Sequence, residues 1–181
     1  MDKYIKGGKQ TELTKRIEDI SKELMGDGLD LVEHTLKWIH KNLKTNNDPE
    51  LKNKIFRTRT ADQIIKDGFV TGCTDSALVF LALTRAKGVP AKYVETIRRR
   101  WLEVGDDDFI EGHIFSEVYI NDKWYIIDPA EGQLLFWYNR WVVYDRGLDS
   151  WDIGIHNMQE LKDEFANFKD NYKNNKKTEQ Q

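Results

Sequence analysis

The most informative segment of the sequence is residues 71–91, which read TGCTDSALVFLALTRAKGVPA. Apolar side chains lie around most of the circumference of a helix drawn through these residues, which is typical of a helix buried at the centre of a domain. Gly88 followed by Pro90 predicts the end of that helix. Cys73, the only cysteine of the chain, stands at its start. The segment therefore predicts a central helix that carries a single thiol at its N-terminus.

Helical periodicity also marks the residues before this segment. Apolar residues recur at intervals of three or four from Leu13 to Leu24 and from Val32 to Leu43, which predicts two helices. Residues 60–63 read TADQ and have the form of a capping box, which predicts a short helix that ends near Gly68. The first part of the chain is therefore predicted to be helical.

The pattern changes after Pro90. Residues 93–97, 113–120 and 123–128 are rich in β-branched and aromatic side chains, and the short polar loop Asn121-Asp122 predicts a β-hairpin between the last two runs. Helices first and strands later indicate an α+β fold.

Less regular patterns follow around and beyond the hairpin. Arg98–Arg100 are interpreted as a solvated strand edge, and Asp106–Asp108 as a loop. Two further strands are predicted at 134–138 and 141–144. A last helix is predicted from Met158 to Phe168, with a polar, frayed tail from about residue 169.

Length and composition restrict the class of protein. The chain has 181 residues and a formal net charge of −3, which argues against a protein that mainly binds nucleic acid. A single cysteine excludes an internal disulfide and a zinc site built from several cysteines, and no cofactor is implied. No apolar run is long enough to span a membrane and no signal peptide is visible, so the default expectation is a cytoplasmic protein. We expect one domain over residues 1–181, with its core at about 55–145.

The position of Cys73 suits a nucleophile. A helix N-terminus carries free N–H groups and partial positive charge, which favour thiolate over thiol. A lone cysteine is as often a small buried apolar residue, so its position alone leaves both interpretations open.

His113 and Asp128 favour the nucleophile interpretation. If the hairpin turns at residues 121–122, Ile120 pairs with Lys123, and His113 and Asp128 become diagonal neighbours on one face of the hairpin. Asp128 is then able to orient the imidazole and leave its other nitrogen for a thiol. A shift of one residue in the register would separate them.

At three places the sequence resembles the transglutaminase-like superfamily. Residues 71–91 are similar to that family's nucleophile helix, which ends in Leu-x-Arg-x-x-Gly-[Ile/Val]-Pro-Ala, here residues 83–91. His113 with residues 117–119, and Trp124 with Asp128-Pro129, resemble the family's His and Asp strands in the same order. The resemblance covers about Arg57 to Glu131. It implies a papain-like core in which the nucleophile helix packs on an antiparallel β-sheet, with a helical N-terminus and a C-terminal helix.

The resemblance also implies a chemistry. Cys73 would be the nucleophile, His113 the general base and acid, and Asp128 the orienting carboxylate. The implied reaction is acyl transfer on a peptide or carboxamide through a Cys thioester, with hydrolysis by a protease, amidase or deamidase as the main expectation. Two alternatives stay open: an amine-accepting transglutaminase, and a catalytically inactive module that binds peptide or glycan.

Three positions depart from the family pattern. Thr71 stands where the family has glycine, Gly72 where an acidic residue is common, and Ile114 where a small residue is usual. The first two changes fall in the turn that leads into the nucleophile helix. The Cys73 backbone N–H is the expected oxyanion donor, while Gln63 is assigned to the capping box in preference to a second donor role.

Five of the six tryptophans lie after residue 100. We expect most of them to pack in the core or between strands. A groove for an extended polymer is the alternative for some of them. The five are Trp101, Trp124, Trp137, Trp141 and Trp151.

Overall fold

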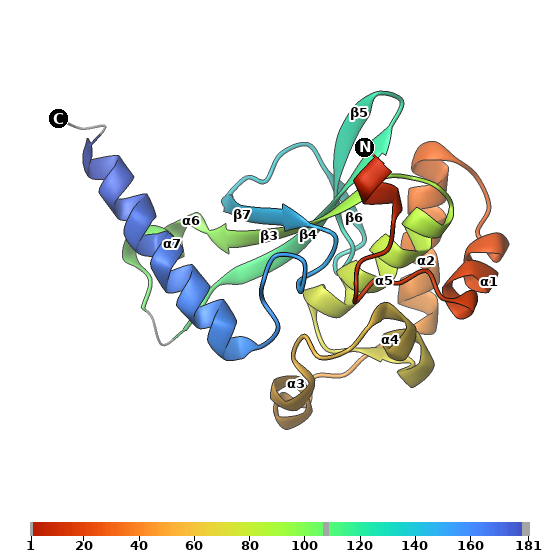
Figure 1. Ribbon diagram of the computed structural model, residues 1–181, viewed down its shortest axis with the longest axis horizontal. Helices are drawn as coiled ribbons and strands as arrows, with labels where there is room; N and C mark the ends of the chain where they lie inside the picture. Colours follow the sequence, from red (N-terminus) through yellow and green to blue (C-terminus); the bar gives the residue numbers. More distant parts are fainter. Residues whose placement is uncertain (1, 107–108, 179–181) are drawn as a thin grey trace.

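The computed structural model describes residues 2–106 and 109–178. Helices from the first half of the chain gather at one end of the molecule, a sheet lies in the middle, and a long final helix crosses the other end (Figure 1). In chain order the elements are η1 (Asp2–Ile5), α1 (Lys15–Glu23), α2 (Gly28–Asn42), β1 (Lys44–Thr45), α3 (Pro49–Ile55), α4 (Ala61–Asp67), β2 (Phe69–Val70), α5 (Cys73–Ala86), β3 (Ala91–Arg98), α6 (Arg99–Val104), β4 (Gly112–Ile120), β5 (Lys123–Asp128), β6 (Gln133–Leu135), β7 (Trp141–Gly147) and α7 (Met158–Thr178).

The main sheet has the strand order β6-β5-β4-β3-β7, and every neighbouring pair is antiparallel. In the β4–β5 hairpin Ile120 pairs with Lys123 and Ser116 with Ile127, which confirms the predicted register. Both turn residues have positive φ, 48° at Asn121 and 62° at Asp122, as a two-residue hairpin loop requires. The predicted α+β fold is confirmed.

Helix α5 forms the centre of the main core. Its residues from Thr74 to Arg85 are all buried, and it contacts α1, α2 and α4 on one side and β3 and β4 on the other. Burying one large aliphatic side chain contributes about 1.5–3 kcal/mol, so the apolar residues of this helix stabilise the fold substantially. The predicted buried helix at residues 73–86 is confirmed.

Arg85 fastens the C-terminal end of α5. Its Nε and Nη2 donate to the Ala91 carbonyl at 3.0 and 2.7 Å, and its Nη1 donates to Oγ1 of Thr11 at 2.8 Å. Between helix and strand, Gly88 adopts a left-handed φ of 78°, which lets the chain reverse direction. The residues of the signature Leu-x-Arg-x-x-Gly-Val-Pro-Ala therefore hold α5, β3 and the N-terminal segment together.

Three helices differ from the sequence predictions. Helix α3 (Pro49–Ile55) was not predicted, and Asp48 caps it by accepting from two backbone N–H groups. Arg99 and Arg100 begin α6 and are not a strand edge. The predicted frayed tail is instead the continuation of α7 to Thr178. Two of the residues expected in the acidic loop, 107 and 108, lie outside the described part of the chain.

A second, smaller core explains α6 and α7. Trp101 and Leu102 of α6 are buried with Leu161 and Phe165 of α7 and with Ile97. Beyond the predicted end of α7, Lys169 donates to the Gly105 carbonyl at 2.7 Å and ties the helix to the end of α6. Tertiary contacts thus order a segment whose composition is mostly polar.

The two strands predicted after the hairpin lie at opposite edges of the sheet. Strand β6 pairs with β5, whereas β7 pairs with β3. The chain between them, residues 136–140, crosses from one edge to the other. A separate parallel pair, β1 with β2, was not predicted because each strand has only two residues.

No helix within residues 2–106 and 109–178 has both the length and the apolar character needed to cross a bilayer.

Replacing Thr60 by alanine will lower the free energy of unfolding by about 1 kcal/mol, because the capping box at the start of α4 is lost. Oγ1 of Thr60 accepts from the Gln63 backbone N–H at 3.3 Å, and the Gln63 side chain accepts from the Thr60 N–H at 2.9 Å. Urea denaturation measures the change. Thr60→Ser retains the oxygen and is the matched control, and equal losses in both variants would contradict this explanation.

Candidate active site

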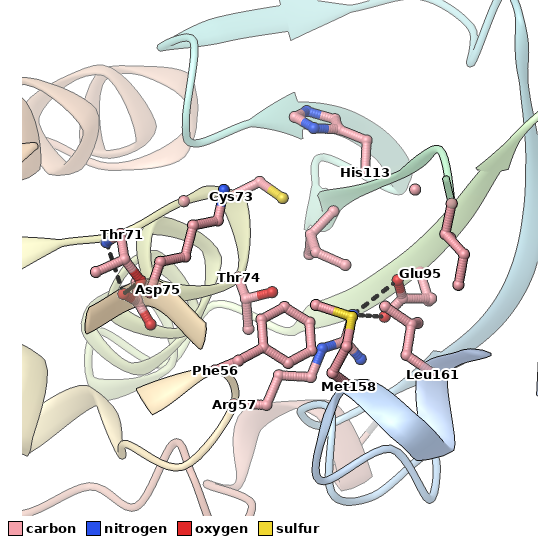
Figure 2. Close-up of a pocket in the computed structure, with 15 residues that line it drawn as sticks. Phe56, Arg57, Thr71, Cys73, Thr74, Asp75, Glu95, His113, Met158 and Leu161 are labelled. Atoms are coloured by element: carbon pink, nitrogen blue, oxygen red, sulfur yellow. Dashed lines mark hydrogen bonds and ion pairs between the residues drawn. The ribbon is translucent and has the colours of Figure 1, made fainter. Parts of the chain in front are cut away.

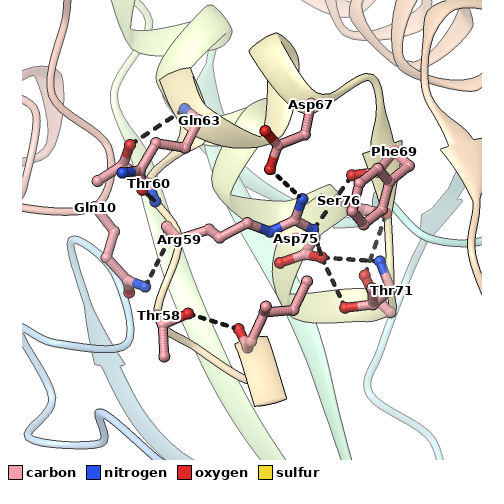
Figure 3. A network of polar contacts seen from close by, with 12 residues as sticks. Gln10, Thr58, Arg59, Thr60, Gln63, Asp67, Phe69, Thr71, Asp75 and Ser76 are labelled. Carbon is pink, nitrogen blue, oxygen red and sulfur yellow. Dashed lines mark hydrogen bonds and ion pairs between the residues drawn. The ribbon is translucent and has the colours of Figure 1, made fainter. Parts of the chain in front are cut away.

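Cys73 is the first residue of α5 and lies at the end of the helix that the core leaves partly uncovered. Asp75, two residues later, fixes the turn that precedes Cys73. Oδ2 of Asp75 accepts from the Thr71 N–H at 2.8 Å and from the Thr71 hydroxyl at 2.9 Å. The same oxygen accepts from Nη2 of Arg59 at 2.6 Å (Figure 3). The position of the thiol is therefore set by a buried carboxylate with three donors.

These contacts explain the departures from the family pattern. Thr71 supplies two of the donors to Asp75, which a glycine could do only in part. Gly72 has an extended backbone (φ 165°, ψ −169°), and an added Cβ would meet only the end of the Lys52 side chain at 3.9 Å. Ile114 is buried on the opposite face of β4 from His113, within the α5 core. None of the three changes disturbs the entry into the helix.

His113 and Asp128 meet on one face of the hairpin. Nε2 of His113 lies 2.7 Å from Oδ2 of Asp128. Oδ1 of Asp128 accepts from the backbone N–H groups of Ala130 and Glu131 at 3.1 and 3.2 Å. Asp128 thus holds the turn after β5 with one oxygen and the imidazole with the other. With Nε2 engaged by the carboxylate, Nδ1 is the nitrogen left for a second partner.

Two aromatic rings hold the imidazole in place. Trp141 of β7 stacks on it with ring centroids 5.4 Å apart and an interplanar angle of 28°. Phe115 contacts it edge-to-face at 4.7 Å. Phe115 also contacts Trp141, with ring centroids 6.2 Å apart. The imidazole therefore has little freedom to rotate away from Asp128.

The charge state of His113 follows from these contacts. Burial lowers the pKa of the imidazole, but the hydrogen bonds with Asp128 and Cys73, together with the charges of both, raise it to about 10. His113 is therefore an imidazolium at neutral pH. A positive ring next to a thiol is the arrangement that stabilises a thiolate.

Cys73 and His113 line one pocket of about 210 Å³ (Figure 2). Apolar side chains form part of its wall, and the thiol and the imidazole lie on the same side of it. The apolar part includes Phe56 after α3, Ile110 before β4, and Met158 and Leu161 of α7. The pocket thus places a candidate nucleophile and proton donor beside an apolar cavity of side-chain size.

A buried ion pair borders the same pocket. Nη2 of Arg57 lies 2.8 Å from Oε2 of Glu95, and both side chains are 2% exposed or less. Tyr93 donates to Oε2 of Glu95 at 3.1 Å. Burial raises the pKa of Glu95, while Arg57 opposes that shift. Within the described part of the chain, Nε and Nη1 of Arg57 are buried without a hydrogen-bond partner.

The sequence did not indicate the buried Arg57–Glu95 ion pair beside the pocket. Glu95 lies among β-forming residues. A carboxylate at a strand position that is expected to be buried was the one signal that could have indicated a buried charged partner. Arg57 and Arg59 lie in the connection before α4, where nothing in the sequence marks them as buried. Gln63 does not line the pocket of Cys73, and its side chain makes the capping-box contact with Thr60.

The profile of the Transglutaminase-like superfamily matches residues 13–129. The chain therefore belongs to the transglutaminase-like superfamily, and the match begins well before Arg57, so that α1 and α2 are part of the family fold. A search of curated proteins finds no match.

The fold is similar to that of a solved structure. A proposed cysteine protease from Cytophaga hutchinsonii matches with a TM-score of 0.64 and 19% identity, over 84% of this chain and 48% of that one. A proposed protease from Parabacteroides distasonis matches with a TM-score of 0.45 and 15% identity, over 74% of this chain and 29% of that one. The present chain thus spans about half the length of the Cytophaga protein.

Cys73 will react rapidly with iodoacetamide at about pH 6, where a free thiol with a pKa of about 8.5 is almost entirely protonated and slow. The physical reason is the His113 imidazolium, which stays protonated in neutral solution because the pKa of His113 is raised to about 10. His113→Ala will lower the rate at about pH 6 by at least about tenfold. Stopped-flow alkylation across pH measures this, and the single cysteine makes the signal specific.

His156→Ala is the matched control, because that exposed imidazole contacts Glu160 and not the pocket. It should leave the alkylation profile unchanged. A slow rate that rises only in alkali, identical in wild type and His113→Ala, would contradict the pairing of Cys73 with His113.

Glu95→Ala will lower the free energy of unfolding by about 3–5 kcal/mol, because it leaves the Arg57 charge buried without compensation. Replacing both partners together, Arg57→Met with Glu95→Leu, will recover most of that loss. Chemical denaturation gives the values, and Glu23→Ala on the exposed end of α1 is a control expected within about 0.5 kcal/mol of wild type. A small effect of Glu95→Ala would show that the pair is not desolvated.

Proposed function

We propose that this protein is a thiol-dependent hydrolase that cleaves a peptide or carboxamide through a thioester on Cys73. In this proposal His113 is the general acid and base and Asp128 orients it. The single observation that carries the proposal is the position of His113, held by Asp128 on Nε2 and lining the pocket of the only cysteine. Membership of the transglutaminase-like superfamily is consistent with this chemistry.

Acylation would proceed from the ion pair of thiolate and imidazolium. The sulfur attacks the carbonyl carbon, and the carbonyl π electrons move to oxygen. The Cys73 backbone N–H, which belongs to the first turn of α5 and has no partner within the helix, would donate to the developing oxyanion. As the intermediate collapses, Nδ1–H of His113 protonates the leaving nitrogen and the C–N bond breaks. A thioester and a neutral imidazole result.

Deacylation would reverse the roles. Neutral His113 accepts a proton from water, whose oxygen attacks the thioester carbonyl. The C–S bond breaks, its electrons return to sulfur, and the thiolate–imidazolium pair is restored. Asp128 keeps the ring oriented in both half-reactions and stabilises its positive form.

The apolar walls of the pocket guide the choice of a first substrate. Phe56, Ile110 and Leu161 form an apolar surface around the space beside the thiol. An aliphatic acyl side chain buries surface there and gains free energy. N-acetyl-leucine p-nitrophenyl ester is therefore a suitable probe, because its activated leaving group does not require a matched amine side.

Incubation with this ester will release a burst of one p-nitrophenolate per protein and will add the acyl mass to the peptide that contains Cys73. Stopped-flow absorbance and mass spectrometry detect the two events. Cys73→Ala will abolish the burst, and His113→Ala will slow acyl turnover by about 10²–10⁴-fold. N-acetyl-leucyl peptides then test the amide reaction.

The outcomes separate the alternatives. Release of free acid with regeneration of the thiol supports a hydrolase. Product formed mainly by capture with millimolar amine, in preference to water, would favour the amine-accepting transglutaminase. Absence of a burst above that of Cys73→Ala would overturn the enzymatic proposal and favour a binding module.

A further inference from the structure

A second groove is lined by both His113 and Asp128 but not by Cys73. It has a volume of about 480 Å³. Its aromatic wall consists of Phe115, Trp137, Tyr138 and Trp141, and Glu131 and Arg140 contribute its charged groups besides the pair itself. The mechanism proposed above uses His113 and Asp128 but leaves the rest of this groove without a role.

Most of the aromatic wall is fixed in place. Trp141 stacks on His113 at 5.4 Å, and Tyr138 contacts Phe115 edge-to-face at 5.4 Å. The Tyr138 hydroxyl donates to Oε1 of Glu117 at 2.6 Å, which anchors the ring to β4. A surface that is held in this way binds a ligand without a large loss of side-chain entropy.

Trp137 is the exception, because 67% of it is exposed. It belongs to a short segment, Leu134 to Trp137, that provides three of the eight large apolar residues exposed in the described part of the chain. Neighbouring Phe136 is 86% exposed but does not line the groove. Concentrated exposed aromatic surface beside a candidate catalytic group is typical of a ligand-binding site.

The arrangement of the two cavities assigns a direction to the substrate. Cys73 lines only the first of them, whereas His113 lines both. A carbonyl carbon attacked by the sulfur must lie at the Cys73 pocket, and the leaving nitrogen must lie at His113 to be protonated. The chain attached to that nitrogen therefore continues beyond His113 into the aromatic groove.

The charges of the groove favour an uncharged occupant. Asp128 is compensated by His113 at 2.7 Å. Glu131 and Arg140 carry opposite formal charges, so the groove has no excess of either sign. A flat aromatic ring on the substrate gains both apolar burial and stacking on Trp137, which a phosphate or a strongly cationic group would not.

We propose that this groove is the leaving-group subsite and that it selects an aromatic residue directly on the amine side of the scissile amide. Trp137 is the specificity-determining residue. The proposal rests on the hydrolase function proposed above. It names a substrate class for that function: peptides in which an aromatic residue follows the cleaved bond.

The same subsite must accept an amine in the reverse direction. The amine nitrogen attacks the thioester carbonyl, His113 takes one proton from it, and the C–S bond breaks to restore the thiolate while the C–N bond forms. Preference for a leaving amine therefore appears as preference for an acceptor amine. This allows a test that does not depend on the natural acyl group.

The acyl-enzyme is formed from N-acetyl-leucine p-nitrophenyl ester in the presence of glycinamide, phenylalaninamide or tryptophanamide. Each amide then competes with water for the acyl group. We expect the two aromatic amides to capture the acyl group about three- to tenfold better than glycinamide. Trp137→Ala should bring this ratio to within about twofold of one. Phe136→Ala, which removes a neighbouring exposed ring outside the groove, should keep it.

Several results would overturn the subsite. Capture that shows no aromatic preference in wild type would do so, as would equal losses in Trp137→Ala and Phe136→Ala. Better capture by glucosamine than by the aromatic amides would favour a glycan in the groove and overturn the peptide assignment. Alkylation of Cys73 at the wild-type rate in Trp137→Ala verifies that the variant is folded around an intact nucleophile.

The failure of the subsite is distinct from the failure of the proposed function. If no acyl-enzyme forms with the ester, the hydrolase proposal fails and the subsite fails with it. If the acyl-enzyme forms and hydrolyses but captures all the amides equally, only the assignment of the groove is wrong.

Discussion

The burial of α5 on nearly every side is the constraint on which the rest of the structure depends. A helix enclosed by α1, α2 and α4 and by β3 and β4 must have its polar ends satisfied within the protein. Arg85 bonds the Ala91 carbonyl at the C-terminal end, and Asp75 holds the preceding turn at the N-terminal end. The first residue, Cys73, is left at the edge of the core, so the enclosure of the helix also positions the thiol.

Three buried arginines lie in α5 or next to it, and each has an oxygen partner. Arg59 contacts Asp75, Arg57 contacts Glu95, and Arg85 contacts the Ala91 carbonyl. Removing such charges from water is costly, and their pairing at best offsets that cost. We infer that these contacts fix positions more than they add stability. The Arg57 and Arg59 pairs join segments that meet beside the candidate site, and Arg85 joins the opposite end of α5 to β3. The His113–Asp128 pair has the same character on the sheet.

Much of the fold was predictable because its signals are local. The period of the apolar residues gave α1, α2 and α5, the capping box gave α4, and the two-residue turn gave the hairpin and its register. The register placed His113 next to Asp128, and their hydrogen bond is present. Helix α6 was missed because six residues are too few to show a period, and the extent of α7 was missed because Lys169 is ordered by a distant carbonyl.

The sequence by itself determined the central helix, the hairpin and the order of Cys73, His113 and Asp128, since periodicity, capping and turn chemistry act between near neighbours. Only the tertiary structure decided what surrounds them. The Arg57–Glu95 pair joins residues 38 positions apart, and Trp141 reaches His113 only because β7 pairs with β3 at the far edge of the sheet. Contacts of this kind depend on how separate elements pack together, a property of the whole chain that no short segment encodes.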